Sequence, residues 1–392
     1  MALTNTLANL SNFLKTIYEP QLVDLIAGEG RLLGWLPKKT ARGYDFKTGL
    51  EFGAGGGGFT GRGGARPAHV YEPEALQADV AIKVWQMKFD ISRPALIGAS
   101  TSEQAFEDML SLISRRCFKT LRSTINAVLY RGYLEEVKSF SSNTWTVKGS
   151  VDPLRHLANQ YIDSYDGSGN KHCDSYKIER IASDTTFVTT GSGNDPQADD
   201  YIYLEDSYGN QPDPLTTIIS DTGTVNGIDK SKYYLWQSFV YDANDTDLNI
   251  EVLIKALHKV EADGASRVNM ILLTSPSVLQ KYHDTLLAYG RFTGEGPLKL
   301  DGGYVAPLTF SGVPLVPDIA CPDGYLFFLE KSAIGLWQIR PPEFPCKTET
   351  GMVFYADSSY DGYWWDLAWD IQLFSPIPRR LALYKNINTT IS

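Results

Sequence analysis

The chain has 392 residues and a mass of 43.5 kDa, which predicts two or three domains or one large elaborated domain. Hydrophobic residues make up 43% and charged residues 21%, which argues against bulk disorder, a collagen-like chain and a coiled-coil rod. Lysines and arginines number 36 and acidic residues 46, so the net charge is −10. An acidic surface repels phosphate, which argues against a dedicated nucleic-acid binder.

The four cysteines lie far apart and form no C-x-x-C motif, which excludes a zinc site built from cysteine pairs. No run of about 18 apolar residues occurs, so the sequence contains no candidate membrane span. Its first residues also lack the charged and continuous apolar regions of a signal peptide. We therefore expect no membrane partner, and a location in the cytoplasm or in a structure assembled there.

Residues 3–18 carry leucines and Ile17 at spacings of three and four, which predicts a short amphipathic helix. This helix either packs on its own domain or forms an arm that packs on another subunit. Pro20, Gly28 and Gly30 break the pattern soon afterwards, and these breaks favour the arm.

Residues 53–64 (GAGGGGFTGRGG) contain eight glycines in twelve positions. A phosphate-binding loop would continue into Gly-Lys-Ser or Gly-Lys-Thr, and no such sequence follows. Glycines lose much backbone entropy on ordering, so this run does not hold one conformation by itself. We expect a mobile loop or a loop that a partner orders.

Residues 78–92 predict a long strand whose buried face changes along its length. Its apolar side chains lie first at even positions, at Val80, Ile82 and Val84, and then at odd positions from Trp85 to Ile91. Because neighbouring residues of a strand face opposite sides, this change indicates a twist or a bulge. A strand that passes between two environments suits a projecting hairpin.

The strongest helical pattern covers residues 102–131, where apolar side chains from Phe106 to Val128 recur at helical spacing. Thr101 and Gln104 form a capping-box pattern at its start, and Gly132 is a natural stop. At 1.5 Å per residue, such a helix is about 45 Å long.

Further along the chain, strand and helix signals alternate. Residues 136–212 are rich in turn signals, and we expect a small inserted β-domain there with strands at 176–181, 186–190 and 201–204. The elements predicted after it form an α+β unit: a helix over 247–264, a buried strand over 268–274, a helix with Ser275 as N-cap and Pro276 as first residue that runs to about Tyr289, and strands at 315–317 and 325–329.

Residues 363–373 alternate strictly between two faces, which predicts a half-buried strand. Trp364, Trp365 and Trp369 with Asp366 and Asp370 also suggest a carbohydrate platform, since aromatic faces stack on sugars and carboxylates accept hydroxyl hydrogens. Strict alternation favours core packing over the platform.

Two short clusters resemble chemical sites only superficially. The first cluster is His172, Cys173 and Asp174, which are adjacent in sequence. Neighbours on a strand face opposite sides, so adjacency does not bring these side chains together. The surrounding Gly, Asn and Ser residues predict a loop here. Residues 242–247 resemble a calcium loop but lack its glycine and its final glutamate, so we expect a solvated loop before a helix.

Charge is distributed unevenly along the chain. Residues 31–66 carry seven basic and two acidic residues, a net charge of +5, whereas residues 190–250 carry eleven acidic and two basic residues, a net charge of −9. A basic, extended segment in an acidic protein suits contact with another copy of the chain; local charge variation without a role is the alternative. The candidates for intersubunit contact are Lys38, Lys39, Arg42, Lys47, Phe59, Arg62 and Arg66.

The order of these features resembles the major capsid protein of tailed bacteriophages, which has the Hong Kong 97 fold. The order is a helical arm, a glycine-rich hairpin, a long helix, an inserted β-domain, an α+β domain and a returning strand. The most specific stretch is 213–340, which includes ILLTSPSVLQKYHDTLLAYGRF and LKLDGGYVAPLTFSGVPLVPDIACPDGYLFFLEKSAIGLW. No short motif is diagnostic alone, and the ordered set carries the resemblance.

The resemblance implies an α+β Hong Kong 97-like fold and assigns a role to each part of the chain. The implied parts are an N-terminal arm (1–45), an extended loop with peripheral-domain strands (46–98), a spine helix (99–135), an inserted β-rich domain (136–212), an axial domain (213–340) and a return to the peripheral domain (341–392).

The resemblance also implies a structural protein with no enzymatic activity, cofactor or metal. It would assemble through hexamers and pentamers into the icosahedral shell of a virion, in the host cytoplasm. An extended arm and hairpin cannot bury their apolar side chains within one subunit, so neighbours should complete the fold. The implied partners are packaged double-stranded DNA without sequence specificity, a portal protein, optionally a decoration protein, and a separate scaffolding protein, because only about 45 residues precede the loop.

Two other functions stay open. An encapsulin-like nanocompartment would use the same fold but enclose an enzyme instead of DNA. A carbohydrate-binding or hydrolytic protein would use Trp364, Trp365, Asp366 and Asp370.

Overall fold

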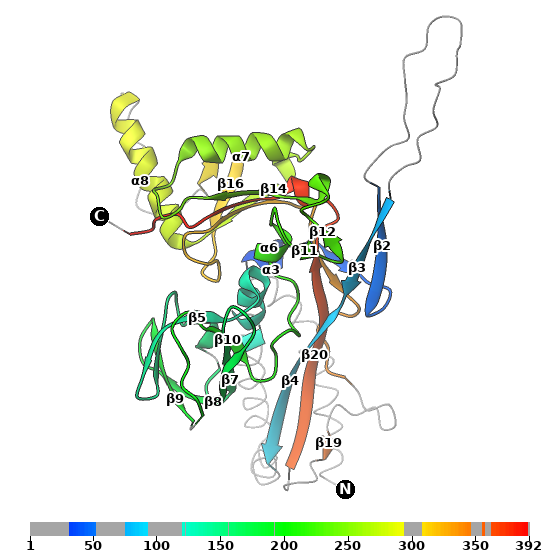
Figure 1. The fold of residues 1–392 in the computed structure, drawn as a ribbon, viewed down its shortest axis with the longest axis vertical. Coiled ribbons are helices and arrows are strands. Elements are labelled where there is room, and N and C mark those ends of the chain that lie inside the picture. Colours follow the sequence, from blue (N-terminus) through cyan, green and yellow to red (C-terminus); the bar gives the residue numbers. More distant parts are fainter. Residues whose placement is uncertain are drawn as a thin grey trace, which may run out of the picture.

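The computed structural model describes residues 31–51, 75–92, 120–121, 123–155, 157–191, 193–293, 308–345, 355–356 and 362–390. Over these ranges the protein is mixed α+β, with a helix-covered sheet, a sheet of long strands, a closed barrel and a projecting hairpin (Figure 1). None of the helices in these ranges is long and apolar enough to cross a membrane.

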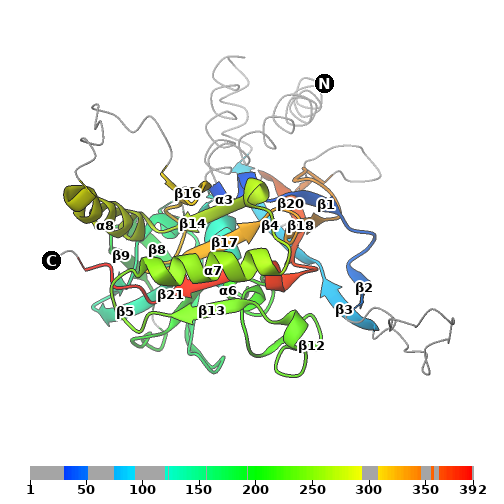
Figure 2. The ribbon, with the colours of Figure 1, turned by 90° about the horizontal axis from the view of Figure 1, so that it is seen from above.

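The helix-covered sheet, here called the central sheet, has the strand order β13-β21-β17-β14-β16-β15. β14 is parallel to β16 and antiparallel to β17, and β13 is parallel to β21. Figure 2 shows α7 lying along one face of this sheet. The strands are β13 (Phe239–Asp242), β14 (Met270–Thr274), β15 (Thr309–Phe310), β16 (Val313–Pro317), β17 (Leu326–Glu330) and β21 (Ala382–Lys385), and the helices are α7 (Ile250–Ala262) and α8 (Pro276–Thr293).

Local sequence sets the ends of the helices on this sheet. The Asn249 side chain accepts a hydrogen bond from the backbone N–H of Glu251 at 2.8 Å and so caps α7, and Gly264 adopts a φ of +91° beyond its other end. The helix predicted over 247–264 is therefore confirmed with slightly shorter ends. α8 begins at Pro276, as predicted, and continues past Tyr289.

The strand predicted over 268–274 is shorter in the structure. Residues Arg267–Asn269 form the 3-10 helix η4, and the side chain of Val268 is 93% exposed. The strand begins only at Met270, so the prediction of a buried Val268 is wrong. The backbone N–H and C=O groups of Val268 therefore lie before the first residue pair of this strand, Met270 with Glu330.

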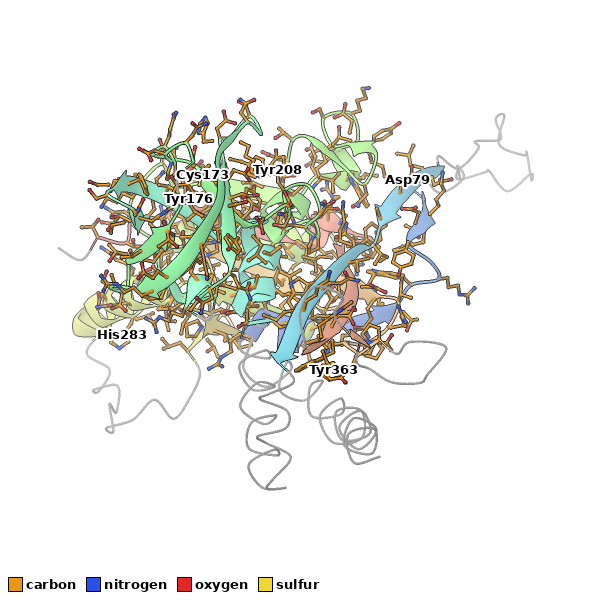
Figure 3. All side chains as sticks on the ribbon, turned by 90° about the horizontal axis from the view of Figure 1, so that it is seen from below. Asp79, Cys173, Tyr176, Tyr208, His283 and Tyr363 are labelled. Atoms are coloured by element: carbon orange, nitrogen blue, oxygen red, sulfur yellow. The ribbon has the colours of Figure 1, made fainter. Side chains whose placement is uncertain are left out.

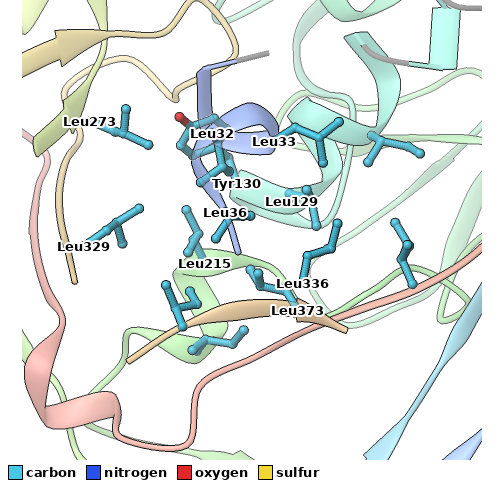
Figure 4. Packing of buried hydrophobic residues seen from close by; sticks show 14 of the residues in the cluster. Leu32, Leu33, Leu36, Leu129, Tyr130, Leu215, Leu273, Leu329, Leu336 and Leu373 are labelled. Carbon is cyan, nitrogen blue, oxygen red and sulfur yellow. The ribbon is translucent and has the colours of Figure 1, made fainter. Parts of the chain in front are cut away.

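Both faces of the central sheet are covered, and every residue of β14 and β17 is buried. Leu272 and Phe328 pack against α7 and α8 in one core. Leu273 and Phe327 belong to a second core, with α3 (Arg31–Trp35) and the helical residues 120–131 (Figure 4). Continuous apolar strands are typical of a sheet that is enclosed on both sides.

Residues 120–131, apart from 122, are the described part of the helix predicted over 102–131, and they are helical. The rest of that prediction, including Thr101 and Gln104, lies outside the described residues. Gly132 ends the helix with a φ of +83°, and its N–H donates to the carbonyl of Val128 at 2.8 Å. This glycine is the stop that the sequence predicts.

The sheet of long strands has the order β1-β18-β20-β19, and β4 pairs with β20 from Ser92↔Gly362 to Lys83↔Ile371. Its members come from distant parts of the chain. The terminal segment 341–392 supplies β20 to this sheet and β21 to the central sheet. The strands are β1 (Lys38–Thr40), β4 (Lys83–Ser92), β18 (Gly335–Gln338), β19 (Tyr355–Ala356) and β20 (Gly362–Phe374).

The prediction that residues 363–373 form a strand is confirmed, but the strand is not half-buried throughout. Asp370 and Gln372, expected on an open face, are both buried. The Asp370 carboxylate accepts a hydrogen bond from the hydroxyl of Tyr44 at 3.2 Å, and the Gln372 amide donates to the carboxylate of Asp213 at 2.9 Å. Partners from distant segments therefore satisfy these polar groups.

The barrel closes in the order β10-β5-β6-β9-β8-β7 around its own core, in which Trp145 and Phe187 stack at 5.5 Å. The strands predicted at 176–181, 186–190 and 201–204 are confirmed. The elements are β5 (Glu135–Ser141), β6 (Thr144–Val147), the 3-10 helix η2 (Asp152–Leu154), β7 (Tyr161–Tyr165), β8 (Lys171–Ile181), β9 (Thr186–Thr190) and β10 (Tyr201–Leu204).

Short elements link the barrel to the central sheet: α6 (Leu215–Ile218), β11 (Thr224–Val225), β12 (Ile228–Asp229) and the 3-10 helix η3 (Tyr234–Trp236). A further 3-10 helix, η5 (Pro378–Arg380), connects β20 to β21.

A buried carboxylate, that of Asp318, joins three separate segments of the chain. It accepts hydrogen bonds from the backbone N–H of Leu32 at 3.2 Å, the amide of Asn126 at 3.2 Å and the hydroxyl of Tyr130 at 3.0 Å. The N–H of Ala320 also donates to it, at 3.0 Å. Burial, followed by the charge of Asp318, raises the pKa of Tyr130, so the hydroxyl remains a donor.

We predict that Asp318→Ala lowers the free energy of unfolding by about 3 kcal/mol, because it leaves several buried donors without an acceptor. Urea unfolding followed by tryptophan fluorescence measures the change. Asp195→Ala, at an exposed aspartate of the barrel region, is the matched control and should change the midpoint little. Equal midpoints for the two variants would show that the Asp318 contacts do not stabilise the fold.

Candidate functional site

The hairpin consists of β2 (Asp45–Glu51) and β3 (Ala75–Ala81), which pair antiparallel along their whole length. It projects from the body of the molecule (Figures 1 and 2). The glycine-rich run between its strands, with the candidates Phe59, Arg62 and Arg66, lies outside the described residues. So does the arm predicted at residues 3–18.

The base of the hairpin packs against its own subunit. The ring of Phe46 stacks on Trp337 at 4.8 Å. The buried cluster beneath the hairpin consists of Ala78, Val80, Ile228, Trp236 and Phe374. The expectation that the hairpin cannot bury its apolar side chains within one subunit is therefore wrong for its base. Sequence reasoning also missed the role of Ile228 and Trp236, although the apolar run YYLW at 233–236 was a signal for it.

The change of buried face predicted for residues 78–92 occurs at Ile82. Before it, β3 pairs with β2, and after it β4 pairs with β20. Ala78, Val80 and Ile82 are buried. Val84, which the sequence places with the buried even positions, is 46% exposed because the change comes two residues earlier.

The described basic candidates lie along β1, the following turn and β2, not in one pocket. The ammonium group of Lys39 lies over the ring of Trp337, 5.5 Å from its centroid. Lys47 forms an exposed ion pair with Asp79 at 3.5 Å. Lys38 and Arg42 are exposed. Together they distribute positive charge along the residues that lead into the hairpin, here called its basic edge.

A hydrogen bond from Gln77, and then the charge of Lys47, lower the pKa of Asp79 despite slight desolvation. Asp79 lies on the hairpin, well apart from the barrel (Figure 3). Its carboxylate is therefore ionised over the neutral range, and it offsets part of the basic charge at this edge.

A buried lysine fastens the segment that supports the hairpin. The side chain of Lys230 is 0% exposed, and its ammonium group donates to the carbonyls of Ile218 at 2.6 Å and Ser220 at 2.9 Å. Burial lowers the pKa of Lys230 to about 8. In the same segment, the carbonyl of Asn226 accepts a hydrogen bond from the N–H of Asp79 at 3.0 Å.

The acidic segment 190–250 does not form one surface. Asp199 lies on the barrel, where it pairs with Lys148 at 2.6 Å. Asp229 lies on β12, and Asp242 lies at the end of β13, where the amide of Asn386 donates to it at 2.9 Å. The charge contrast in the sequence is therefore spread over several parts of the fold.

Residues 364–370 pack in the core, as the alternation favoured, and do not form the alternative carbohydrate platform. Trp365 and Trp369 are 2% and 1% exposed, so their faces are not available for stacking. The ring of Trp364 lies instead beneath the ammonium group of Lys88, at 5.3 Å. Burial raises the pKa of Asp366.

The two short clusters carry no reactive arrangement. His172 and Cys173 lie on β8 and not in a loop, with Cys173 buried in the barrel core (Figure 3) and His172 facing Asp200, whose carboxylate oxygen is 2.8 Å from Nδ1. Burial raises the pKa of Cys173 to about 12, which suppresses its thiolate. Among the described residues, no group of three or more His, Cys, Asp or Glu side chains is placed to hold a metal ion.

No family model matches the sequence, and no curated protein does. Solved structures do match the fold. A chain of the cyanophage A-1(L) capsid asymmetric unit is 14% identical, with a TM-score of 0.52 over 92% of this chain and 93% of that chain. The capsid chain of a native GTA particle is 11% identical, with a TM-score of 0.55 over 91% of this chain and 90% of that chain.

The capsid chain of an empty GTA particle is 10% identical, with a TM-score of 0.54 over 91% of this chain and 90% of that chain. Each of these matches covers most of both chains. The protein therefore has the fold of these phage and GTA capsid chains.

We predict that Trp236→Ala loosens the hairpin, because it removes the largest buried side chain beneath Ala78 and Val80. Hydrogen exchange should become at least tenfold faster in β2 and β3 and stay unchanged in the barrel. Leu235→Ala, at an exposed neighbour, is the control. Unchanged exchange in the hairpin of Trp236→Ala would show that the cluster does not support it.

We predict that the stability contributed by Lys230 depends on pH. Unfolded lysine has an ordinary pKa of 10.5, so between about pH 8 and 10.5 the unfolded state binds more protons and the free energy of unfolding rises with pH. Below about pH 8 both states are protonated, and the contribution is constant. The difference between wild type and Lys230→Met should change by about 3 kcal/mol across this window. Parallel pH profiles for the two proteins would contradict the prediction.

Proposed function

We propose that this chain is the major capsid protein of a tailed phage, a structural virion protein that assembles into an icosahedral shell around double-stranded DNA. The fold shared with phage and GTA capsid chains over most of the sequence carries the proposal. The burial of Trp365 and Trp369 removes the sugar platform on which the enzymatic alternative depended.

We assign the parts of a Hong Kong 97-like fold to this chain as the sequence suggests. The hairpin β2–β3 would be the root of the extended loop, the helical residues 120–131 the end of the spine helix, and the barrel the inserted domain. The central sheet would form the axial domain, and the sheet of long strands the peripheral domain. The continuous pairing of β4 with β20 supports the last assignment.

Assembly would proceed through hexamers and pentamers, with the basic edge of the hairpin and the glycine-rich run contacting a neighbouring copy. A separate scaffolding protein, a portal protein and optionally a decoration protein are the further partners in this proposal, and assembly would take place in the host cytoplasm. The net charge of −10 suits a wall that encloses DNA without binding it tightly.

Size-exclusion chromatography with light scattering, followed by negative-stain microscopy, tests the proposal. The purified chain, alone or co-expressed with its scaffolding protein, should form closed particles tens of nanometres across. Particles from infected or producing cells should contain double-stranded DNA, whereas an enclosed enzyme would indicate a nanocompartment. A 43.5 kDa monomer under both conditions would contradict shell formation.

We predict that the double variant Arg62→Glu and Arg66→Glu blocks assembly and leaves the subunit folded, because it reverses the charge of the segment proposed to contact a neighbour. Particle yield by sedimentation should fall at least tenfold, with unchanged circular dichroism. The double variant Lys138→Glu and Arg180→Glu, at two exposed basic residues of the barrel, is the charge-matched control and should assemble normally. Normal shells from the double variant would refute this role of the segment.

A further inference from the structure

A cleft with a volume of about 790 Å³ lies between the barrel and the sheet of long strands. Its size is within the range of small-molecule sites. One wall is formed by Ile82 and residues 83–88 of β4, and another by the helical residues Thr124, Ile125 and Val128. The facing wall is formed by the barrel residues 159–161 and 203–204 and by the segment 205–212 that follows β10. None of the roles assigned above uses this cleft.

The lining of the cleft is mixed, with apolar side chains such as those of Trp85, Met87 and Ile125 and, among them, several neutral polar side chains. The amides of Gln86, Asn159 and Gln160 face it from two opposite walls, and none of the three makes a side-chain hydrogen bond with another described residue. The rings of Tyr161, which is 44% exposed, and Tyr203 lie among them. Such a lining offers donors, acceptors and aromatic faces together.

The barrel side of the cleft is held in place by contacts behind it. The fully buried carboxylate of Asp163 accepts hydrogen bonds from the backbone N–H groups of Asp206 and Ser175, both at 2.9 Å. The rings of Tyr165 and Tyr208 stack at 4.2 Å beside this loop, and Figure 3 shows Tyr208 on the barrel. A wall fixed in this way reduces the entropy lost on binding.

The charges around the cleft narrow the class of ligand. The ammonium group of Lys83 donates to the carbonyl of Gly209 at 3.0 Å, and that of Lys88 lies over Trp364, so neither is placed to bind a phosphate. Glu205 and Asp206 at the cleft repel anions. A wholly apolar ligand would displace water from the amides and offer them no hydrogen bonds in return. Such a ligand is therefore disfavoured.

We propose that this cleft binds a neutral oligosaccharide. Its hydroxyl groups would exchange hydrogen bonds with the amides of Gln86, Asn159 and Gln160, and an apolar sugar face would stack on Tyr161 or Tyr203. An extended polypeptide is the competing occupant. Amides on both walls and the exposed ring of Tyr161 on the barrel wall offer the hydrogen-bonding groups and the aromatic face that a sugar uses.

Saturation-transfer NMR on the full chain tests the proposal with maltotriose, cellotriose and triacetylchitotriose as probes. At least one probe should receive saturation from the wild type. The double variant Gln160→Ala and Tyr161→Ala should weaken its binding at least tenfold, and so should Gln86→Ala on the opposite wall. Tyr234→Ala, at an exposed tyrosine outside the cleft, is the matched control and should bind as the wild type does.

Near-ultraviolet circular dichroism should show that each variant keeps the aromatic packing of the barrel. No saturation transfer to any of the three sugars would overturn the proposal, as would unchanged binding by both cleft variants. A synthetic peptide of residues 53–66 is included as a competitor. If this peptide binds and the sugars do not, and the cleft variants lose the peptide, the cleft is a polypeptide site and the proposal is wrong.

Discussion

The carboxylate of Asp318 determines how the main parts of this protein meet. Its donors come from Leu32, Asn126 and Tyr130, which lie 286, 192 and 188 positions away in the sequence. A buried carboxylate without hydrogen-bond donors destabilises the folded state. The segments that carry Asp318 and its donors therefore stabilise one another's positions. The contact holds the helical residues 120–131 beside the central sheet, and Gly132 ends that helix shortly before β5 of the barrel.

The elements that sequence analysis predicted well are those whose signal is local. α7 has a stripe of buried apolar residues with a cap at each end, and β9 and β10 are short β-branched or aromatic runs between turn residues. β14 and β17 are continuous apolar runs, because helices and a second core cover both faces of their sheet. The α+β class followed from the order of these signals.

Features that depend on partners distant in sequence were not predictable in the same way. Asp370 and Gln372 lie at the polar positions of an alternating strand, which the sequence places on an open face. In the structure they are buried, and they form hydrogen bonds with Tyr44 and Asp213. Likewise, nothing local identifies Trp236 as the support of the hairpin. Of the proposed contact residues, Lys38, Lys39, Arg42 and Lys47 are placed along β1, the following turn and β2. The glycine-rich run has no periodicity from which a structure follows.

The barrel begins and ends at the same point of the fold. The N–H of Leu134 donates to the carbonyl of Ile202 at 2.9 Å, and Glu135 pairs with the same residue across β5 and β10. The chain therefore enters and leaves the barrel at adjacent positions, and a short connection there would join the rest of the fold whatever domain is inserted. Evolution could exchange or lose this unit without rerouting the chain, and the same junction offers a place to graft a foreign domain for display.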